Sequence, residues 1–400
     1  MKKIILILCG TALLFSCKTT EVQPVQEESV KNDNYIEESS PDLPEETLPP
    51  ALESEELVTA EELPPAAEES IGEAEKTVTI TEAEETSSET ERPILDGELI
   101  VAKQIVVEAD SSSSIVVDWQ NDKKARVAKP TFSEKELIYK TDENGVSLKL
   151  KIFYHPESQK KQGIVIFVPG GDFLDCDINS FADERKYLCE SGFVVASMEY
   201  HTAENGIYTD SLKDISDAIM FLRMHFRDFN ANPTKVALFG TSAGGYLASL
   251  FACMDSSMIT CVVDFYGYSD LTRIADDFDE ETKSKHRAYN ASEALFVNGK
   301  ESRTGIFENA QNALNSNPLT YVGGDEVPFL FMHGTADKVV SPSQTVILHN
   351  SLLSKGVRSV RCSLVGVGHG DASFSSESAL GMVVDFLSDN FNPQKSLLQK

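Results

Sequence analysis

The sequence predicts an α/β fold in which a mostly parallel, eight-stranded sheet is flanked by helices and carries a small cap insertion. From residue 137 onward, short apolar segments alternate with stretches of helical periodicity, the pattern of a parallel sheet wrapped by helices. Residues 269–316 interrupt this alternation with a polar, charged segment that is predicted to hold no strand and to form the cap.

Eight segments have the length and apolar content of buried strands. Between them, residues 211–226 have apolar side chains at the three-to-four residue spacing of an amphipathic helix. The predicted strands are residues 137–140, 148–153, 164–168, 194–198, 236–239, 261–265, 329–332 and 361–364.

Charge and composition divide the chain before this region. Residues 21–92 carry 23 acidic and 3 basic side chains, and the apolar periodicity that a core needs is missing there. Such a segment buries too little apolar surface to offset chain entropy, so residues 17–95 are predicted to be a disordered acidic tether rich in proline and glutamate. Residues 96–136 are β-rich and of uncertain role, with strand-like segments at 99–107 and 115–119 that suggest a hairpin or edge strands. The globular domain is predicted over residues 137–400.

The first 16 residues have the features of an export signal. Lys2 and Lys3 precede a short apolar segment over residues 4–15, and Ser16 and Cys17 follow it. The sequence before Cys17 resembles the bacterial lipobox, which implies cleavage before this cysteine and attachment of fatty acyl chains such as palmitate to its thiol. The expectation is a membrane-anchored lipoprotein of the bacterial cell envelope, facing the periplasm or the exterior. An ordinary secretory signal cleaved near Cys17 is the alternative.

Composition also bears on partners and cofactors. Residues 93–400 carry 41 acidic and 29 basic side chains, and no basic stripe is present, so nucleic acid is not an expected partner. The glycine-rich stretches lack the two spacings that bind nucleotide phosphates, G-x-x-x-x-G-K-[ST] and G-x-G-x-x-G. No His/Cys cluster has the spacing of a metal site, so no metal and no cofactor is expected. The cysteines downstream of Cys17 show no regular spacing, and several are expected to be small buried hydrophobes.

A nucleophile motif follows the strand predicted at 236–239. Residues 240–244 read Gly-Thr-Ser-Ala-Gly, and residues 246–252 after them are helix-like. A lone motif of this kind fits an ordinary turn between strand and helix. The order of strand, tight turn and helix favours instead a nucleophile elbow, in which glycines leave room for a strained turn that exposes the serine hydroxyl. Ser242 is therefore the predicted nucleophile.

A serine nucleophile needs a general base and an acid that orients it, both downstream in this chain order. Asp337 follows the strand at 329–332 and lies on a loop at its carboxyl end, where catalytic loops gather, although a turn or helix-capping role is also common for Asp. Of the two histidines after Asp337, His349 lies on a predicted helix and His369 lies on a glycine-rich loop directly after a strand. His369 is therefore the predicted base.

The tetrahedral intermediate that forms when a serine attacks a carbonyl carries an oxyanion, and backbone N–H donors are needed to stabilise it. Residues 169–173 read Pro-Gly-Gly-Asp-Phe and directly follow the strand at 164–168. The amides of Gly171 or Asp172, together with that of Ala243 after the nucleophile, are the predicted donors. A simple β-turn is the alternative for this glycine pair.

Taken together, residues 137–391 resemble the α/β-hydrolase superfamily, in its bacterial esterase/lipase branch near the hormone-sensitive-lipase-like and feruloyl-esterase-like enzymes. The resemblance implies a serine carboxylic-ester hydrolase. That branch usually has His-Gly-Gly-Gly where this chain has Pro-Gly-Gly-Asp at 169–172, and usually Arg at the position of His201. The stretches that carry the resemblance are residues 192–200, 214–223, 237–245 and 328–340.

The expected substrates are short-chain acyl esters of small molecules or glycans, and the oligomeric state stays open. A serine peptidase of the prolyl-oligopeptidase type shares the elbow and a similar acid loop, but its large N-terminal propeller does not fit into residues 18–136. A non-catalytic surface protein of the same fold, which binds a ligand or partner, is a further alternative. Such a protein has no need of a serine, an acid and a histidine in this order.

Overall fold

The computed structural model describes residues 99–105 and 113–393, which belong to one compact unit, Ser87–Lys400. The predicted export signal at 1–16, the tether at 17–95 and Cys17 lie outside the described residues. No helix within the described residues is long and apolar enough to cross a membrane.

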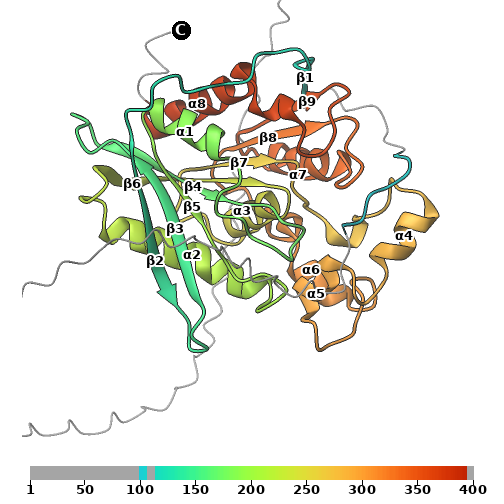
Figure 1. The fold of residues 1–400 in the computed structure, drawn as a ribbon. Coiled ribbons are helices and arrows are strands. Elements are labelled where there is room, and N and C mark those ends of the chain that lie inside the picture. The colour runs from blue at the N-terminus through green and yellow to red at the C-terminus, as the bar shows by residue number, and fades with distance from the viewer. Residues whose placement is uncertain (1–98, 106–112, 394–400) are drawn as a thin grey trace, which may run out of the picture. The chain divides into compact units, whose positions relative to one another are not determined.

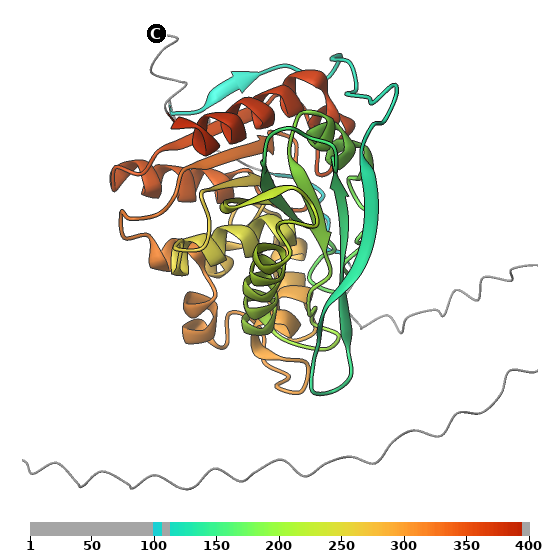
Figure 2. The ribbon, with the colours of Figure 1, turned by 90° about the vertical axis from the view of Figure 1, so that its left-hand side faces the viewer.

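Nine strands form one sheet in the order β1-β9-β8-β7-β6-β4-β5-β3-β2 (Figure 1). The strands from β1 to β5 in this order are parallel, whereas β3 pairs antiparallel with both β5 and β2. Figure 2 shows the long hairpin of β2 and β3 along one side of the molecule. The strands are β1 (Ile115–Val117), β2 (Ser133–Thr141), β3 (Ser147–Tyr154), β4 (Gln162–Val168), β5 (Val194–Met198), β6 (Ala231–Thr241), β7 (Cys261–Phe265), β8 (Phe329–Gly334) and β9 (Ser359–Leu364).

The predicted fold class is confirmed, but the sheet has one strand more than the eight expected. Each of the eight predicted segments lies within one of β2 to β9. The additional strand, β1, comes from the β-rich segment before residue 137 and pairs parallel with β9 at the edge of the sheet. Of the two arrangements expected for this segment, the edge strand is confirmed by β1, which lies within the strand-like residues 115–119. A hairpin is not formed in the described residues, where Ile105 makes only an isolated bridge to Phe278.

Helices cover both faces of the sheet, and the strand residues alternate between the two cores. In β4, Ile164 and Ile166 point into the core that contains α2 (Tyr208–Met224), α3 (Ala243–Met254) and α7 (Ser343–Ser354). Val165 and Phe167 point into the opposite core, with α1 (Ala182–Glu190) and α8 (Glu377–Phe391). Because β4 is buried on both faces, its residues 163–168 are an unbroken apolar run in the sequence.

The insertion between β7 and β8 is helical, as the strandless pattern over 269–316 predicts. Its last part, η2, packs against α3. Phe296 of the insertion stacks on Phe173 at 5.0 Å between ring centroids, so the insertion contacts the loop that follows β4. The elements are η1 (Leu271–Arg273), α4 (Glu280–His286), α5 (Ser292–Asn298), α6 (Ala310–Asn315) and η2 (Pro318–Tyr321), and η3 (Ala372–Ser375) precedes α8.

Candidate active site

Ser242 occupies the sharp turn between β6 and α3. Its φ of 53° and ψ of -123° lie in a region that L-residues rarely adopt. The turn needs small neighbours: a Cβ on Gly240 would lie 2.1 Å from the carbonyl oxygen of Gly244, and a Cβ on Gly244 would lie 2.0 Å from that of Val168. The backbone N–H of Ser242 donates to the carbonyl of Phe265 in β7, which fixes the turn against the sheet.

The structure brings Ser242, His369 and Asp337 into one hydrogen-bonded chain. The Nε2 atom of His369 lies 3.0 Å from Oγ of Ser242, and its Nδ1 lies 2.7 Å from Oδ2 of Asp337. Ser242 follows β6, Asp337 follows β8 and His369 follows β9, so three loops at the carboxyl edge of the parallel strands supply the three side chains. In this arrangement the imidazole can accept the serine proton while the carboxylate fixes its tautomer.

Asp337 is buried, and its surroundings favour the ionised form. Burial alone would raise its pKa, but hydrogen bonds from His333 and His369 outweigh burial and hold the pKa of this carboxyl well below its usual range. The Oδ1 atom also accepts the backbone N–H groups of Val339 and Val340. Burial lowers the pKa of His333, so this histidine contacts the carboxylate as a neutral donor.

Tyr266 is a contact of the histidine that no sequence pattern marks. Its ring meets that of His369 edge to face at 4.6 Å, and Phe374 packs against the same tyrosine at 4.6 Å. The tyrosine directly follows β7 in a left-handed conformation, with a φ of 47°. These contacts restrict the position of the imidazole.

The loop after β4 lies directly beside the serine. A Cβ on Gly170 would lie 3.1 Å from Cβ of Ser242, and the N–H of Gly170 donates to Oγ1 of Thr241. The N–H groups of Gly171 and Asp172 on this loop, and that of Ala243 at the N-terminus of α3, have no acceptor within residues 99–105 and 113–393. Unpaired amides beside a serine are the groups that an oxyanion requires.

Two histidines outside the triad, His349 and His201, have other contacts. His349 is buried in α7 and hydrogen-bonds to Ser359, whereas the base of the chain at Ser242 is His369. His201 contacts Asp214 at 2.7 Å and Asp142 at 3.2 Å, so it joins α2 to the β2–β3 hairpin. This network occupies the position where the resembling enzymes usually have arginine.

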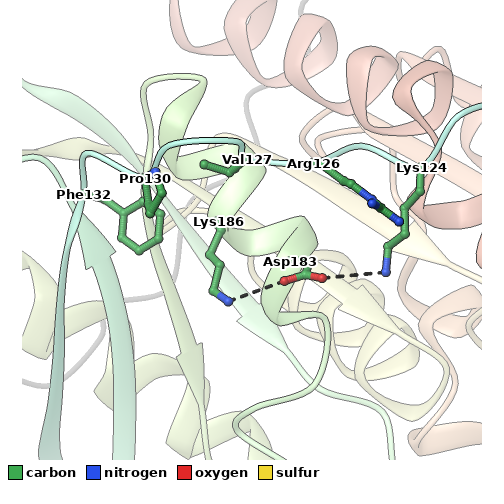
Figure 3. Close-up of a pocket in the computed structure, with 7 residues that line it drawn as sticks. All are labelled: Lys124, Arg126, Val127, Pro130, Phe132, Asp183 and Lys186. Carbon is green, nitrogen blue, oxygen red and sulfur yellow. Dashed lines mark hydrogen bonds and ion pairs between the residues drawn. The ribbon is translucent and has the colours of Figure 1, made fainter.

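A separate hollow of about 430 Å³ lies between α1 and the segment before β2 (Figure 3). Arg126 lines it, and Lys124 and Lys186 approach the carboxylate of Asp183 there at 3.8 and 3.4 Å. Ser242, Asp337 and His369 do not line this hollow. In the part of the chain that the structure describes, no group of three or more His, Cys, Asp or Glu side chains could hold a metal ion, and all five cysteines are buried and free of disulfides.

Comparison with known proteins agrees with this architecture. The fold is that of the α/β-hydrolases: a carbohydrate esterase from gut microbiota, in truncated form, superposes with a TM-score of 0.57 at 20% identity, over 67% of this chain and 100% of that one. An esterase of Thermogutta terrifontis, Est2, superposes with a TM-score of 0.52 at 20% identity, over 65% of this chain and 92% of that one.

The sequence matches the BD-FAE family over residues 150–352, half of the chain, and the protein belongs to this family. Two relatives come from Mycobacterium tuberculosis. The probable carboxylic ester hydrolase LipM is 25% identical over 45% of this chain and 42% of its own length, and the esterase LipQ is 22% identical over 58% and 55%. The chain thus spans about half the length of the curated relatives it matches.

Proposed function

We propose that the protein is a serine carboxylic-ester hydrolase that acts on short-chain acyl esters through an acyl-enzyme. The observation that carries the proposal is the bridging position of His369, 3.0 Å from Oγ of Ser242 and 2.7 Å from Oδ2 of Asp337. Membership of the BD-FAE family and the esterases among its relatives support the same reaction.

In the proposed reaction, Oγ of Ser242 attacks the ester carbonyl carbon while Nε2 of His369 takes its proton. The tetrahedral intermediate expels the alcohol, which receives the proton from His369, and leaves an acyl group on the serine. A water molecule, deprotonated by His369, then attacks the acyl-enzyme and releases the acid. In this proposal the backbone N–H groups of Ala243 and of Gly171 or Asp172 donate hydrogen bonds to the developing oxyanion.

Acylated carbohydrates are the substrate class that we propose to test first. A carbohydrate esterase is among the solved structures with this fold, although its identity of 20% carries the fold alone. The proposed location is the bacterial cell envelope, with the protein anchored through acyl chains on Cys17. That part of the proposal rests on the sequence before Cys17 and on the acidic tether at 17–95.

Labelling with a fluorophosphonate tests the reaction class. We expect covalent modification of wild type at Ser242 and no modification of Ser242→Ala. A panel of p-nitrophenyl esters, acetylated and feruloylated oligosaccharides and a prolyl peptide amide then separates an esterase from a peptidase. A folded wild-type protein that is neither labelled nor active on any ester would overturn the proposal in favour of a binding protein.

A further inference from the structure

Asp172 and Phe173, on the loop beside Ser242, are consecutive non-glycine residues in the left-handed region, with φ values of 51° and 63°. Such conformations persist only where surrounding contacts determine them. The ring of Phe173 supplies one set of contacts, because it is buried and stacks on Phe296 at 5.0 Å and on Tyr268 at 5.5 Å. The insertion therefore holds one of the two strained residues by aromatic packing.

The carboxyl of Asp172 supplies a second contact with the insertion. Its Oδ1 accepts a hydrogen bond from Oγ of Ser292 at 3.1 Å, and its Oδ2 is buried without a hydrogen-bond partner. Oγ of Ser292 also lies 3.3 Å from Oε2 of Glu293, whose Oε1 lies 2.8 Å from Nδ1 of His286. Asp172, Ser292, Glu293 and His286 form one polar cluster, called here the Asp172 cluster.

The carboxyl of Asp172 lacks donors in its ionised form. Glu293 faces Nδ1 of His286 as well as Ser292, whereas Asp172 receives only the single hydroxyl proton of Ser292 and its Oδ2 is buried without a hydrogen-bond partner. The side chains of Glu293 and His286 are 1% and 2% exposed, so water does not compensate for the missing donor. Burial, together with the charge of Glu293, raises the pKa of Asp172 to about 7, while His286 and the bond from Ser292 oppose this rise. Burial, followed by the charges of Asp172 and Glu293, also raises the pKa of the Tyr268 phenol.

We propose that Asp172 is a positioning residue of the esterase, whose carboxyl ties the oxyanion loop to Ser292 and Glu293 of the insertion and so fixes the loop amides beside Ser242. The proposal rests on the proposed ester hydrolysis. When Asp172 is protonated, the cluster contains one negative carboxylate and its contacts hold. When Asp172 loses this proton, two buried anions repel each other across Ser292, and the loop amides move away from the oxyanion position.

The test is the pH dependence of kcat. Because the proton leaves Asp172 as the pH rises through about 7, we expect kcat of the wild type to fall about tenfold between pH 7 and pH 9 while KM stays constant. Asp172→Asn keeps a neutral group of the same shape, and Glu293→Gln removes the opposing charge. Each variant should lack the alkaline fall, and the double variant should behave like either single variant.

Glu280→Gln is the matched control, since Glu280 lies on α4 but is exposed and outside the cluster, and it should keep the wild-type profile. Circular dichroism at each pH verifies that all variants stay folded. A wild-type kcat that does not fall, or a fall that persists in Asp172→Asn or in Glu293→Gln, overturns the proposal while ester hydrolysis itself stands. A wild type without ester turnover or fluorophosphonate labelling at any pH overturns the proposed function instead.

Discussion

His333 and Asp337, four residues apart at the end of β8, are fully buried and lie 3.2 Å apart between Nε2 and Oδ2. The same carboxylate oxygen faces His369, so His333 and the proposed base share the acid of the proposed triad. The Nδ1 atom of His333 lies 2.9 Å from Oγ1 of Thr345 in α7, which fixes the ring of His333 against that helix. The orientation of Asp337 therefore depends on a second histidine.

Replacing His333 with Phe should weaken catalysis without removing it. The variant keeps a ring of similar size but takes one donor from a buried carboxylate, and hydrogen bonds to charged groups contribute about 1.5–3 kcal/mol. We expect kcat to fall by roughly tenfold or more and the Tm to decrease, measured by ester turnover and thermal unfolding. His349→Phe is the control, because it also loses a buried histidine, yet kcat per folded molecule should not change. Equal kcat in both variants would contradict this role of His333.

Ser242→Ala and His369→Ala should each lower ester kcat by several orders of magnitude, since the residues of a triad act as a unit. The double variant should be scarcely slower than either single variant. His349→Ala should cost stability, because this side chain is 1% exposed and hydrogen-bonded to Ser359, but it should leave kcat nearly unchanged. If His349→Ala in folded protein were as damaging as His369→Ala, the choice of base would be wrong.

The strands and the elbow could be predicted because their causes are local. β4 is buried on both faces, so its residues 163–168 are uniformly apolar, and the turn at Ser242 requires glycines at fixed spacing. The strand-like segment at 115–119 does contain β1 (Ile115–Val117), but its partner β9 could not be predicted. Local periodicity does not encode a partner that far along the chain.

The contacts around the site show the same limit. The loop at 169–173 could be placed after its strand, but the position of the Asp172 carboxyl depends on Ser292, which is 120 residues away. Nothing in the local sequence distinguishes an aspartate that faces a substrate from one that is buried against an insertion. Tyr266 likewise reaches His369 only because β7, β8 and β9 are neighbours in the sheet.

Asp264, beneath the elbow, should make stability depend on pH. It is buried, accepts hydrogen bonds from Ser249 and from the N–H of Gly267, and burial raises its pKa to about 7. Its folded pKa exceeds the ordinary value of 3.8, so its contribution to stability is complete below about pH 4 and is lost as the pH rises through about 7. Asp264→Asn should therefore gain stability relative to wild type between pH 4 and pH 7, measured by urea unfolding. Exposed Asp385→Asn is the control, and the same gain there would contradict the assignment.

Cys17 should determine how the protein associates with membranes. Two or three acyl chains on one cysteine anchor a protein durably, so wild type expressed in a bacterial host should partition into the detergent phase. Cys17→Ala should yield an unanchored or unprocessed form, and protease treatment should remove residues 18–92 while leaving an active core. Equal detergent partitioning of wild type and Cys17→Ala would exclude the lipid anchor.

The acyl group of the preferred ester substrate should be short, because the structure offers no open apolar groove at Leu295 and Phe296 to hold a long chain. The sequence allows two arrangements: a carboxylate of Asp172 that faces the acyl group, or an apolar groove under the insertion formed by Leu295 and Phe296. Asp172 instead contacts Ser292 of the insertion. Leu295 and Phe296 are 6% and 0% exposed and belong to the core, so neither lines an open groove.

A long acyl chain gains affinity only by burying its methylene groups, at about 0.8 kcal/mol each. With Leu295 and Phe296 already packed in the core, additional methylenes have little apolar surface to cover in this part of the site. We expect kcat/KM to be highest for acetyl to butyryl p-nitrophenyl esters and to fall toward decanoyl, without activation at lipid interfaces. Leu295→Ala should open space beside the core and shift the preference toward longer chains, whereas Leu353→Ala, on the exposed side of α7, should not. Wild-type rates that climb steadily from acetyl to decanoyl esters would show that a long apolar groove exists.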